Sequence, residues 1–146
     1  MCIRDSAGEM ERRRKKIVKR GTTLAEIDPA QRHRMRIQAK KLRYAAEFFG
    51  ATFPGKKAAR RRKEFIAALE RLQDTLGDLN DISVHEGLTE RLADAQQTGS
   101  KRRRRSANKA FAAGRLSGRE EARIATVLKD AERAYARFAK AKPFWR

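Results

Sequence analysis

Apolar residues recur every three or four positions along almost the whole chain, and no stretch alternates apolar and polar residues as a strand would. Glycine and proline interrupt this helical pattern at Gly21, Gly50, Pro54–Gly55 and Pro143. Helices joined by such short breaks pack as antiparallel neighbours. We therefore predict an all-α fold, an antiparallel helical bundle, and the length of 146 residues suits one domain.

The expected helix boundaries follow from capping residues. A first helix over residues 9–20 ends at Gly21. Asp28 and Pro29 form an N-cap and first-turn pair, which predicts a second helix over residues 29–49. Gly77 is expected to end the third helix, and a capping box at residues 117–120 to begin the last. The remaining helices are expected at residues 56–76, 80–95, 101–113 and 117–142, with a loop at 98–100.

Apolar spacing within these helices predicts the core. The four expected core residues of the third helix follow a coiled-coil-like spacing. The aromatic residues near the C-terminus could stack on bases, but their spacing favours the core, with Phe144 and Trp145 folding back onto the bundle. The expected core residues are Phe65, Leu69, Leu72, Leu76, Leu88, Leu92, Ile124, Leu128, Ala131, Tyr135 and Phe138.

The first eight residues do not fit the pattern that follows them. We expect residues 1–8 to be a foreign or disordered leader and residues 9–146 to form the helical domain. Cys2 is the only cysteine, so an internal disulfide is excluded and a reducing compartment is the simple interpretation. No apolar run is long enough to span a bilayer, so we expect no membrane insertion.

The charge of the chain favours a polyanionic partner. Lys and Arg number 37 against 18 Asp and Glu, a formal net charge of +19. A folded domain this basic repels itself, and nucleic acid, an acidic membrane or polyphosphate would relieve that repulsion. The charges are segregated, which predicts a one-sided positive surface. Basic clusters lie at residues 12–16, 32–43, 60–63 and 101–105, and an acidic segment at 70–94.

Four acidic or amide side chains in that acidic segment could be read as a site for Mg²⁺ or Ca²⁺. Their spacing is not that of an EF-hand, and helix capping explains much of it, so we prefer a structural role and predict no metal site. These residues are Asp74, Asp78, Asn80 and Asp81.

The stretch HRMRIQAKKLRYAAEFFG, residues 33–50, places four cations on one face of the second helix. We expect an apolar arc buried on each side of this face, so that the cations line a groove between helices and bind an anion. The alternative is a solvated face, on which Glu47 pairs with Arg43. The cations are His33, Arg36, Lys40 and Arg43; one arc is Met35, Leu42, Ala46 and Phe49, and the other is Ile37, Tyr44 and Phe48.

This stretch resembles the signature helix of the CHAD domain, the conserved histidine α-helical domain. Three further segments resemble the same family: LQDTLGDLND at residues 72–81, the basic segment 12–21 with its terminal KRG, and AKPFW at 141–145. A full CHAD domain has two helical halves, each opening with such a helix, around a basic cavity. Only one signature helix, of the second-half type, is present here, so the chain resembles the C-terminal half.

The resemblance implies a module that binds inorganic polyphosphate, with cytoplasmic localisation and association with polyphosphate granules. It also implies the binding residues. The positions that match the signature are His33, Arg36, Lys40 and Arg43, and the surrounding basic segments add Lys41, Arg13, Lys16, Arg20, Arg60 and Lys63.

Two other functions stay open. One is a nucleic-acid-binding helical domain, which the charge supports but the absence of a recognition motif and of expected exposed aromatics opposes. The other is an accessory domain of a CYTH-type triphosphatase, since some family members carry such a domain. No nucleophile, base and orienting group can be assembled from the sequence, so we expect neither catalysis nor a cofactor.

Overall fold

The computed structural model describes the backbone of residues 2–97 and 103–146 and, within these ranges, the side chains outside 83–91, 93–117 and 120. The described residues form four α-helices and one short 3₁₀ helix, with no strand among them, which confirms the predicted all-α class. The elements are α1 (Ile3–Gly21), α2 (Pro29–Phe49), η1 (Gly50–Thr52), α3 (Lys56–Gln97) and α4 (Arg103–Lys140).

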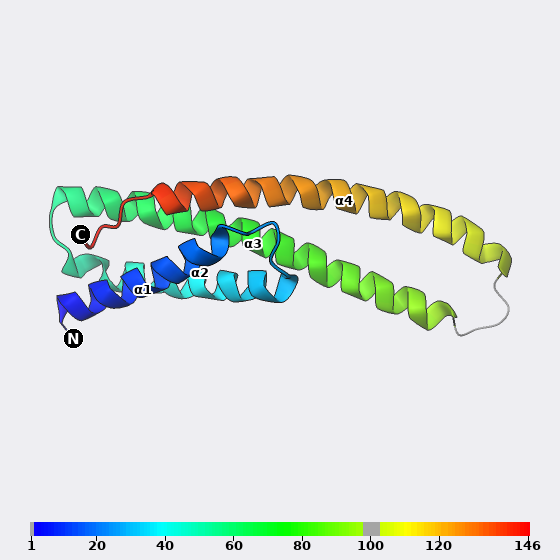
Figure 1. The fold of residues 1–146 in the computed structure, drawn as a ribbon, viewed down its shortest axis with the longest axis horizontal. Helices are drawn as coiled ribbons and strands as arrows, with labels where there is room; N and C mark the ends of the chain where they lie inside the picture. The colour runs from blue at the N-terminus through cyan, green and yellow to red at the C-terminus, as the bar shows by residue number, and fades with distance from the viewer. Residues whose placement is uncertain (1, 98–102) are drawn as a thin grey trace.

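Successive helices run in opposite directions, so the bundle has an up-down-up-down order (Figure 1). α3 packs between α2 and α4, and α1 packs mainly on α2 and also touches α4. α3 and α4 continue well beyond the ends of α1 and α2, while the N-terminus and the C-terminus lie at the opposite end of the molecule (Figure 1).

The structure differs from the expected leader at residues 3–8. These residues form the first turns of α1, and Ser6 is buried, with its hydroxyl donating to the Cys2 carbonyl at 3.5 Å. Ala7 packs against the core. The helix therefore continues toward the N-terminus because small side chains let it approach the bundle. The foreign origin of residues 1–8 stays a prediction.

The ends of α2 lie where the capping residues predicted. The Asp28 side chain accepts a hydrogen bond of 2.7 Å from the Gln31 backbone N–H, and Pro29 is the first helical residue. α2 ends at Phe49 and Gly50 begins η1. Gly55 has a φ of 105°, a left-handed conformation that favours glycine, and it reverses the chain into α3.

The predicted break of the third helix at Gly77 is wrong, because α3 is continuous from Lys56 to Gln97. Leu76 and Leu79 are both buried, so packing on the neighbouring helices extends across the glycine. Burial of such side chains outweighs the ~1 kcal/mol that a glycine costs inside a helix. The expected inward position of Leu92 is also wrong, since it is exposed, whereas the side chain of Leu88 lies outside the described residues.

α4 is likewise one helix, so the predicted break between residues 113 and 117 and the capping box at residues 117–120 are wrong. The local capping pattern is overridden because the helix pairs with α3. The predicted loop at 98–100 lies outside the described residues, and so do the side chains of the basic cluster 101–105.

The core joins all four helices and the C-terminal tail. Four of the predicted core residues of α3, Phe65, Leu69, Leu72 and Leu76, are fully buried. In the predicted stripe of α4, Ala131 and Phe138 are fully buried, whereas Ile124, Leu128 and Tyr135 are partly buried. The tail folds back as expected, so that Phe144 and Trp145 pack edge-to-face on Phe65 of α3. Within the described part of the chain, no helix has the length and hydropathy that crossing a bilayer requires.

Candidate functional site

α2 has four kinds of surface around its axis: a buried apolar face, a basic edge on each side of it, and an exposed apolar row opposite it. Met35, Ala39, Leu42 and Ala46 are fully buried in the core. The four cations His33, Arg36, Lys40 and Arg43, the signature row, lie along one edge of this face, and Arg36 and Arg43 reach α3. A second basic edge, which contains Lys41, lies on the side of α2 toward α1, where Lys41 lines a depression together with Arg12 and Arg13. A row of apolar residues separates the two edges on the outside of the helix.

This outer row, which consists of Ile37, Tyr44 and Phe48, corrects the prediction of a second buried arc. The three side chains are 38%, 49% and 78% exposed, respectively. Helical periodicity correctly grouped them, but α2 packs mainly on α3 and α1, and its outer side stays exposed. The signature row therefore lies between a buried face and an exposed apolar row, at a surface and not between two buried surfaces.

Arg36 of the signature row packs on α3. Its guanidinium lies against Gly77, where an added Cβ would come within 3.3 Å of Nε. That Nε is buried and has no hydrogen-bond partner among the residues that the structure describes. The absence of a side chain at Gly77 therefore leaves the space in which the arginine stem lies along α3. His33 and Lys40, by contrast, are exposed.

Arg43 is the member that internal carboxylates approach. Its Nε lies 3.7 Å from Glu47 Oε1, and its Nη1 lies 3.6 Å from Glu70 Oε1 on α3. The pair with Glu47 bears out one part of the solvated-face alternative. Both distances are long for charge-assisted hydrogen bonds, and both carboxylate side chains are about half exposed. Arg43 is thus partly compensated within the protein and contributes less free positive charge than its neighbours.

Tyr44 of the outer row makes cation–π contacts with two residues of the signature row. Arg43 Cζ lies 5.2 Å from the centroid of its ring, and Lys40 Nζ lies 5.7 Å from it. Cation–π contacts of this kind hold flexible side chains near a ring without neutralising their charge. The ring therefore restrains two cations of the signature row at the surface.

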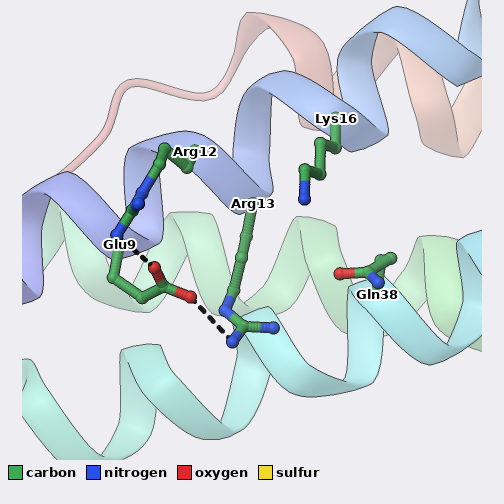
Figure 2. Close-up of a pocket in the computed structure, with 5 residues that line it drawn as sticks. All are labelled: Glu9, Arg12, Arg13, Lys16 and Gln38. Carbon is green, nitrogen blue, oxygen red and sulfur yellow. Dashed lines mark hydrogen bonds and ion pairs between the residues drawn. The ribbon is translucent and has the colours of Figure 1, made fainter.

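On the α1 side, a hollow of about 150 Å³ lies between α1 and α2. Figure 2 shows Arg13 and Lys16 extending from α1 toward α2, where Gln38 faces them. Glu9 supplies the single carboxylate of the hollow and lies between two guanidinium groups. The residues that line this α1–α2 hollow are Glu9, Arg12, Arg13, Lys16 and Gln38.

A wider depression of about 560 Å³ continues from the α1–α2 hollow along α2 and shares three of its residues. It brings Lys41 and Tyr44 of α2 into the same depression as Arg12 and Arg13, and Asp5 adds a second carboxylate. The structure thus assembles three of the predicted site residues, Arg13, Lys16 and Lys41, from two helices.

The other predicted site residues are not part of this assembly. Arg20 and Lys63 are exposed, and no contact joins them to the hollow or to the signature row within the described residues. Arg60 is exposed and its Nε lies 3.1 Å from Glu64 Oε1 one turn away. These three positions were selected as members of basic segments, and segment membership does not determine the direction of a side chain.

Sequence reasoning missed four residues of the site: Glu9, Arg12, Gln38 and Tyr44. Arg12 belongs to the basic cluster 12–16, so it could have been predicted as a site residue on the same ground as Arg13 and Lys16. The spacing of Glu9 to Arg12 and Arg13, three and four residues, also predicts ion pairs on one helix face. Nothing in the sequence indicates that Gln38 faces these residues, because that contact depends on how α2 packs on α1.

Metal chemistry has no visible support in the part of the chain that the structure describes. No group of three or more histidine, cysteine or carboxylate side chains converges there. Asp74, Asp78 and Asp81 are exposed on α3, and the continuous helix removes the capping role expected of Asn80 or Asp81.

Comparison with known proteins identifies one family. The family model of the CHAD domain matches residues 4–90, which is more than half of the chain. The match forms the N-terminal part of the chain, begins inside the expected leader, and contains the signature row and the α1–α2 hollow. It does not include residues 141–145, for which we expected a resemblance. Neither a curated protein nor a solved structure matches the chain.

Proposed function

We propose, from the premise that this chain belongs to the CHAD domain family, that it is a non-catalytic helical module that binds inorganic polyphosphate. The ligand would bind the cations on the two basic edges of α2 and the adjoining face of α1. The proposal includes a localisation: we expect a cytoplasmic protein that associates with polyphosphate granules.

The observation that carries this proposal is uncompensated positive charge on a helix that is anchored on its other side. In the described part of the chain, His33, Arg36 and Lys40 have no carboxylate within ion-pair distance. The buried face of α2 keeps their backbone fixed. Holding like charges together costs free energy, and a bound polyanion removes that cost.

Polyphosphate suits this surface because it is a flexible chain of repeated charges. Guanidinium groups offer paired N–H donors to phosphoryl oxygens, and lysine offers a compact charge. A flexible chain can follow the signature row and enter the depression around Lys41 without a rigid complementary shape. Counterion release would supply much of the affinity, so binding should weaken steeply as salt rises.

We further propose that the chain corresponds to the C-terminal half of the CHAD domain, since its one signature helix is of the second-half type. The gene sequence upstream of residue 1 tests this assignment. It would reveal a first signature helix, and also any CYTH-type domain to which this module is an accessory. An upstream segment that contains neither helix nor cavity-forming residues would contradict the assignment.

The binding proposal is tested by charge reversal on α2. We expect Lys40→Glu with Lys41→Glu to raise the dissociation constant for fluorescent polyphosphate about tenfold, since both lysines are exposed and lose their phosphate contacts. Fluorescence anisotropy measures the titration. The matched control is Arg119→Glu with Arg123→Glu, which makes the same change in net charge at exposed positions of α4. Equal losses in the two double variants would contradict a site on α2.

Single-stranded nucleic acid is the second candidate function, and one observation favours it. Tyr44 and Phe48 are exposed aromatics beside cations, whereas the sequence had placed them in the core. Such groups can stack bases. Phe48 is the freer ring, since it is 78% exposed, whereas Tyr44 is 49% exposed and lies near Lys40 and Arg43. At matched phosphate concentration we expect long polyphosphate to displace single-stranded RNA, and the opposite order would favour the nucleic-acid function.

The non-catalytic part of the proposal is tested separately. Incubation of the protein with polyphosphate and Mg²⁺ should release no phosphate. Release that is lost in His33→Ala would instead assign a catalytic role to that histidine, which is exposed on the signature row.

A further inference from the structure

Glu9 occupies a position in the α1–α2 hollow that a phosphoryl group of the ligand would also occupy. Its Oε2 lies 2.6 Å from Arg12 Nη2, and its Oε1 lies 2.7 Å from Arg13 Nη2. Each oxygen of the carboxylate is therefore paired with a different guanidinium, as Figure 2 shows, and the pair with Arg12 is also a hydrogen bond. Two oxygens of one phosphoryl group can accept from the same two donors.

The other two polar side chains of the α1–α2 hollow, Lys16 and Gln38, are available to a ligand. Lys16 and Gln38 line it from α1 and α2, and within the described residues neither has a hydrogen bond or ion pair. Three cations thus face one carboxylate. Glu9 compensates only part of this charge, and it does so with a single negative charge where a polyphosphate chain would bring several.

The ion pairs of Glu9 are of a kind that an incoming anion can displace. The side chains of Glu9, Arg12 and Arg13 are 35%, 74% and 29% exposed, respectively, so water reaches both pairs and the Arg12 pair most. Surface pairs of this sort are weakened by water and by salt. Once displaced, the carboxylate is free to turn into solvent, so its release does not leave a buried unpaired charge.

We propose that the α1–α2 hollow is a phosphoryl-binding site and that Glu9 is its internal competitor, which the ligand must displace from Arg12 and Arg13 to bind. This inference rests on the proposed polyphosphate function and adds a determinant of affinity to it. The competitor lowers affinity for isolated phosphate groups, and a long chain overcomes it by binding the signature row and Lys41 at the same time.

The test removes the competitor without changing its shape. We expect Glu9→Gln to lower the dissociation constant for polyphosphate at least threefold, because Arg12 and Arg13 no longer hold a carboxylate. Glu132→Gln makes the same change in net charge at an exposed position of α4 and should leave the constant within error of the wild type. Glu9→Asp keeps the charge but shortens the side chain, so it should also gain affinity, in a smaller amount.

Two further measurements separate competition from a structural effect. The slope of log K against log salt concentration should become steeper by about one in Glu9→Gln, since the freed arginines acquire counterions that binding then releases. Adding Arg13→Gln to Glu9→Gln should abolish the gain. A variant that merely loosened α1 would produce neither result, and circular dichroism will show whether α1 remains helical.

The outcomes distinguish this inference from the function on which it rests. A wild-type chain that does not bind polyphosphate contradicts both. Binding by the wild type, together with equal affinities in Glu9→Gln and Glu132→Gln, contradicts the competitor alone. Tripolyphosphate, used as a short probe, should show a larger relative gain in Glu9→Gln than the long polymer does, and an equal gain would contradict the role of the additional contacts.

Discussion

At the scale of single residues, Tyr135 shows how one side chain fastens α4 to the end of α1. Its hydroxyl donates a hydrogen bond of 2.6 Å to the Val18 carbonyl. Its ring covers Gly21, where an added Cβ would overlap the ring carbons. Burial raises the pKa of Tyr135 above its ordinary value of 10.0, and the nearby Arg14 guanidinium partly opposes this. The neutral hydroxyl is therefore the form that the folded protein favours.

We expect Tyr135→Phe to lower the free energy of unfolding at pH 7 by ~1 kcal/mol, since the Val18 carbonyl loses its hydroxyl donor. A pKa that is raised on folding contributes stability that is complete below pH ~10 and is lost as pH rises through the folded value. The difference in unfolding free energy between wild type and Tyr135→Phe should therefore become smaller above pH ~10. Urea denaturation at several pH values measures both effects.

Tyr44→Phe is the matched control, because Tyr44 is exposed and its hydroxyl has no hydrogen bond within the described residues. Its unfolding free energy should stay within ~0.5 kcal/mol of the wild type. If the two variants behave alike, the anchoring role of Tyr135 is wrong.

At the scale of elements, α3 shows how packing overrides a local helix-stop pattern. Gly77 does not adopt the left-handed conformation of a helix-ending glycine; among the described residues, Gly55 is the glycine with positive φ. α3 passes through Gly77 while burying Leu76 and Leu79 against its neighbours. The continuous helix also keeps Arg36 and the turn around Gly77 in contact.

Gly77→Ala distinguishes the continuous helix from the broken one. In a continuous helix, alanine should raise the unfolding free energy by ~0.5–1 kcal/mol, provided that the flexible Arg36 side chain shifts by a few tenths of an ångström. Alanine at a left-handed cap would destabilise the protein instead. Gly55→Ala provides that comparison, with an expected loss of ~1–2 kcal/mol, since its φ is 105°. Denaturant titrations measure the change in unfolding free energy of both variants, and of Gly77→Ala made in an Arg36→Ala background, where the side chain that packs on Gly77 is gone. A loss of stability from Gly77→Ala in that background would contradict the continuous α3.

At the scale of the whole molecule, the C-terminal tail ties together helices that are distant in sequence. Phe144 packs on Phe53 and on Phe65 of α3. Trp145 packs on the same Phe65, and its indole N–H donates to Glu11 of α1 at 3.0 Å. The tail thus closes the end of the bundle at which α1, α3 and the turn before α3 meet.

We expect Phe144→Ala to lower the unfolding free energy by ~3–4 kcal/mol, since it removes a buried ring from the end of the core. Trp145 is the only tryptophan, so its fluorescence reports the tail directly. Phe48→Ala removes the same side chain from an exposed position and should cost less than ~0.5 kcal/mol. Similar losses in the two variants would contradict the closing role of the tail.

The sequence by itself determined the helical class, the ends of α2 and the grouping of His33, Arg36, Lys40 and Arg43 on one edge. These features are local: an N-cap, a glycine and a 3.6-residue period act within one helix, whatever surrounds it. Even the pairing of Glu9 with Arg12 and Arg13 follows from spacing within α1.

Only the tertiary structure decided which faces are covered. Periodicity assigned two apolar arcs to α2, but α1 and α3 bury one of them and leave Tyr44 and Phe48 exposed. It also decided that Glu70 approaches Arg43 and that Gln38 faces Lys16. The physical reason is that a helix sequence determines which residues share a face, whereas burial of that face depends on the helices that pack against it.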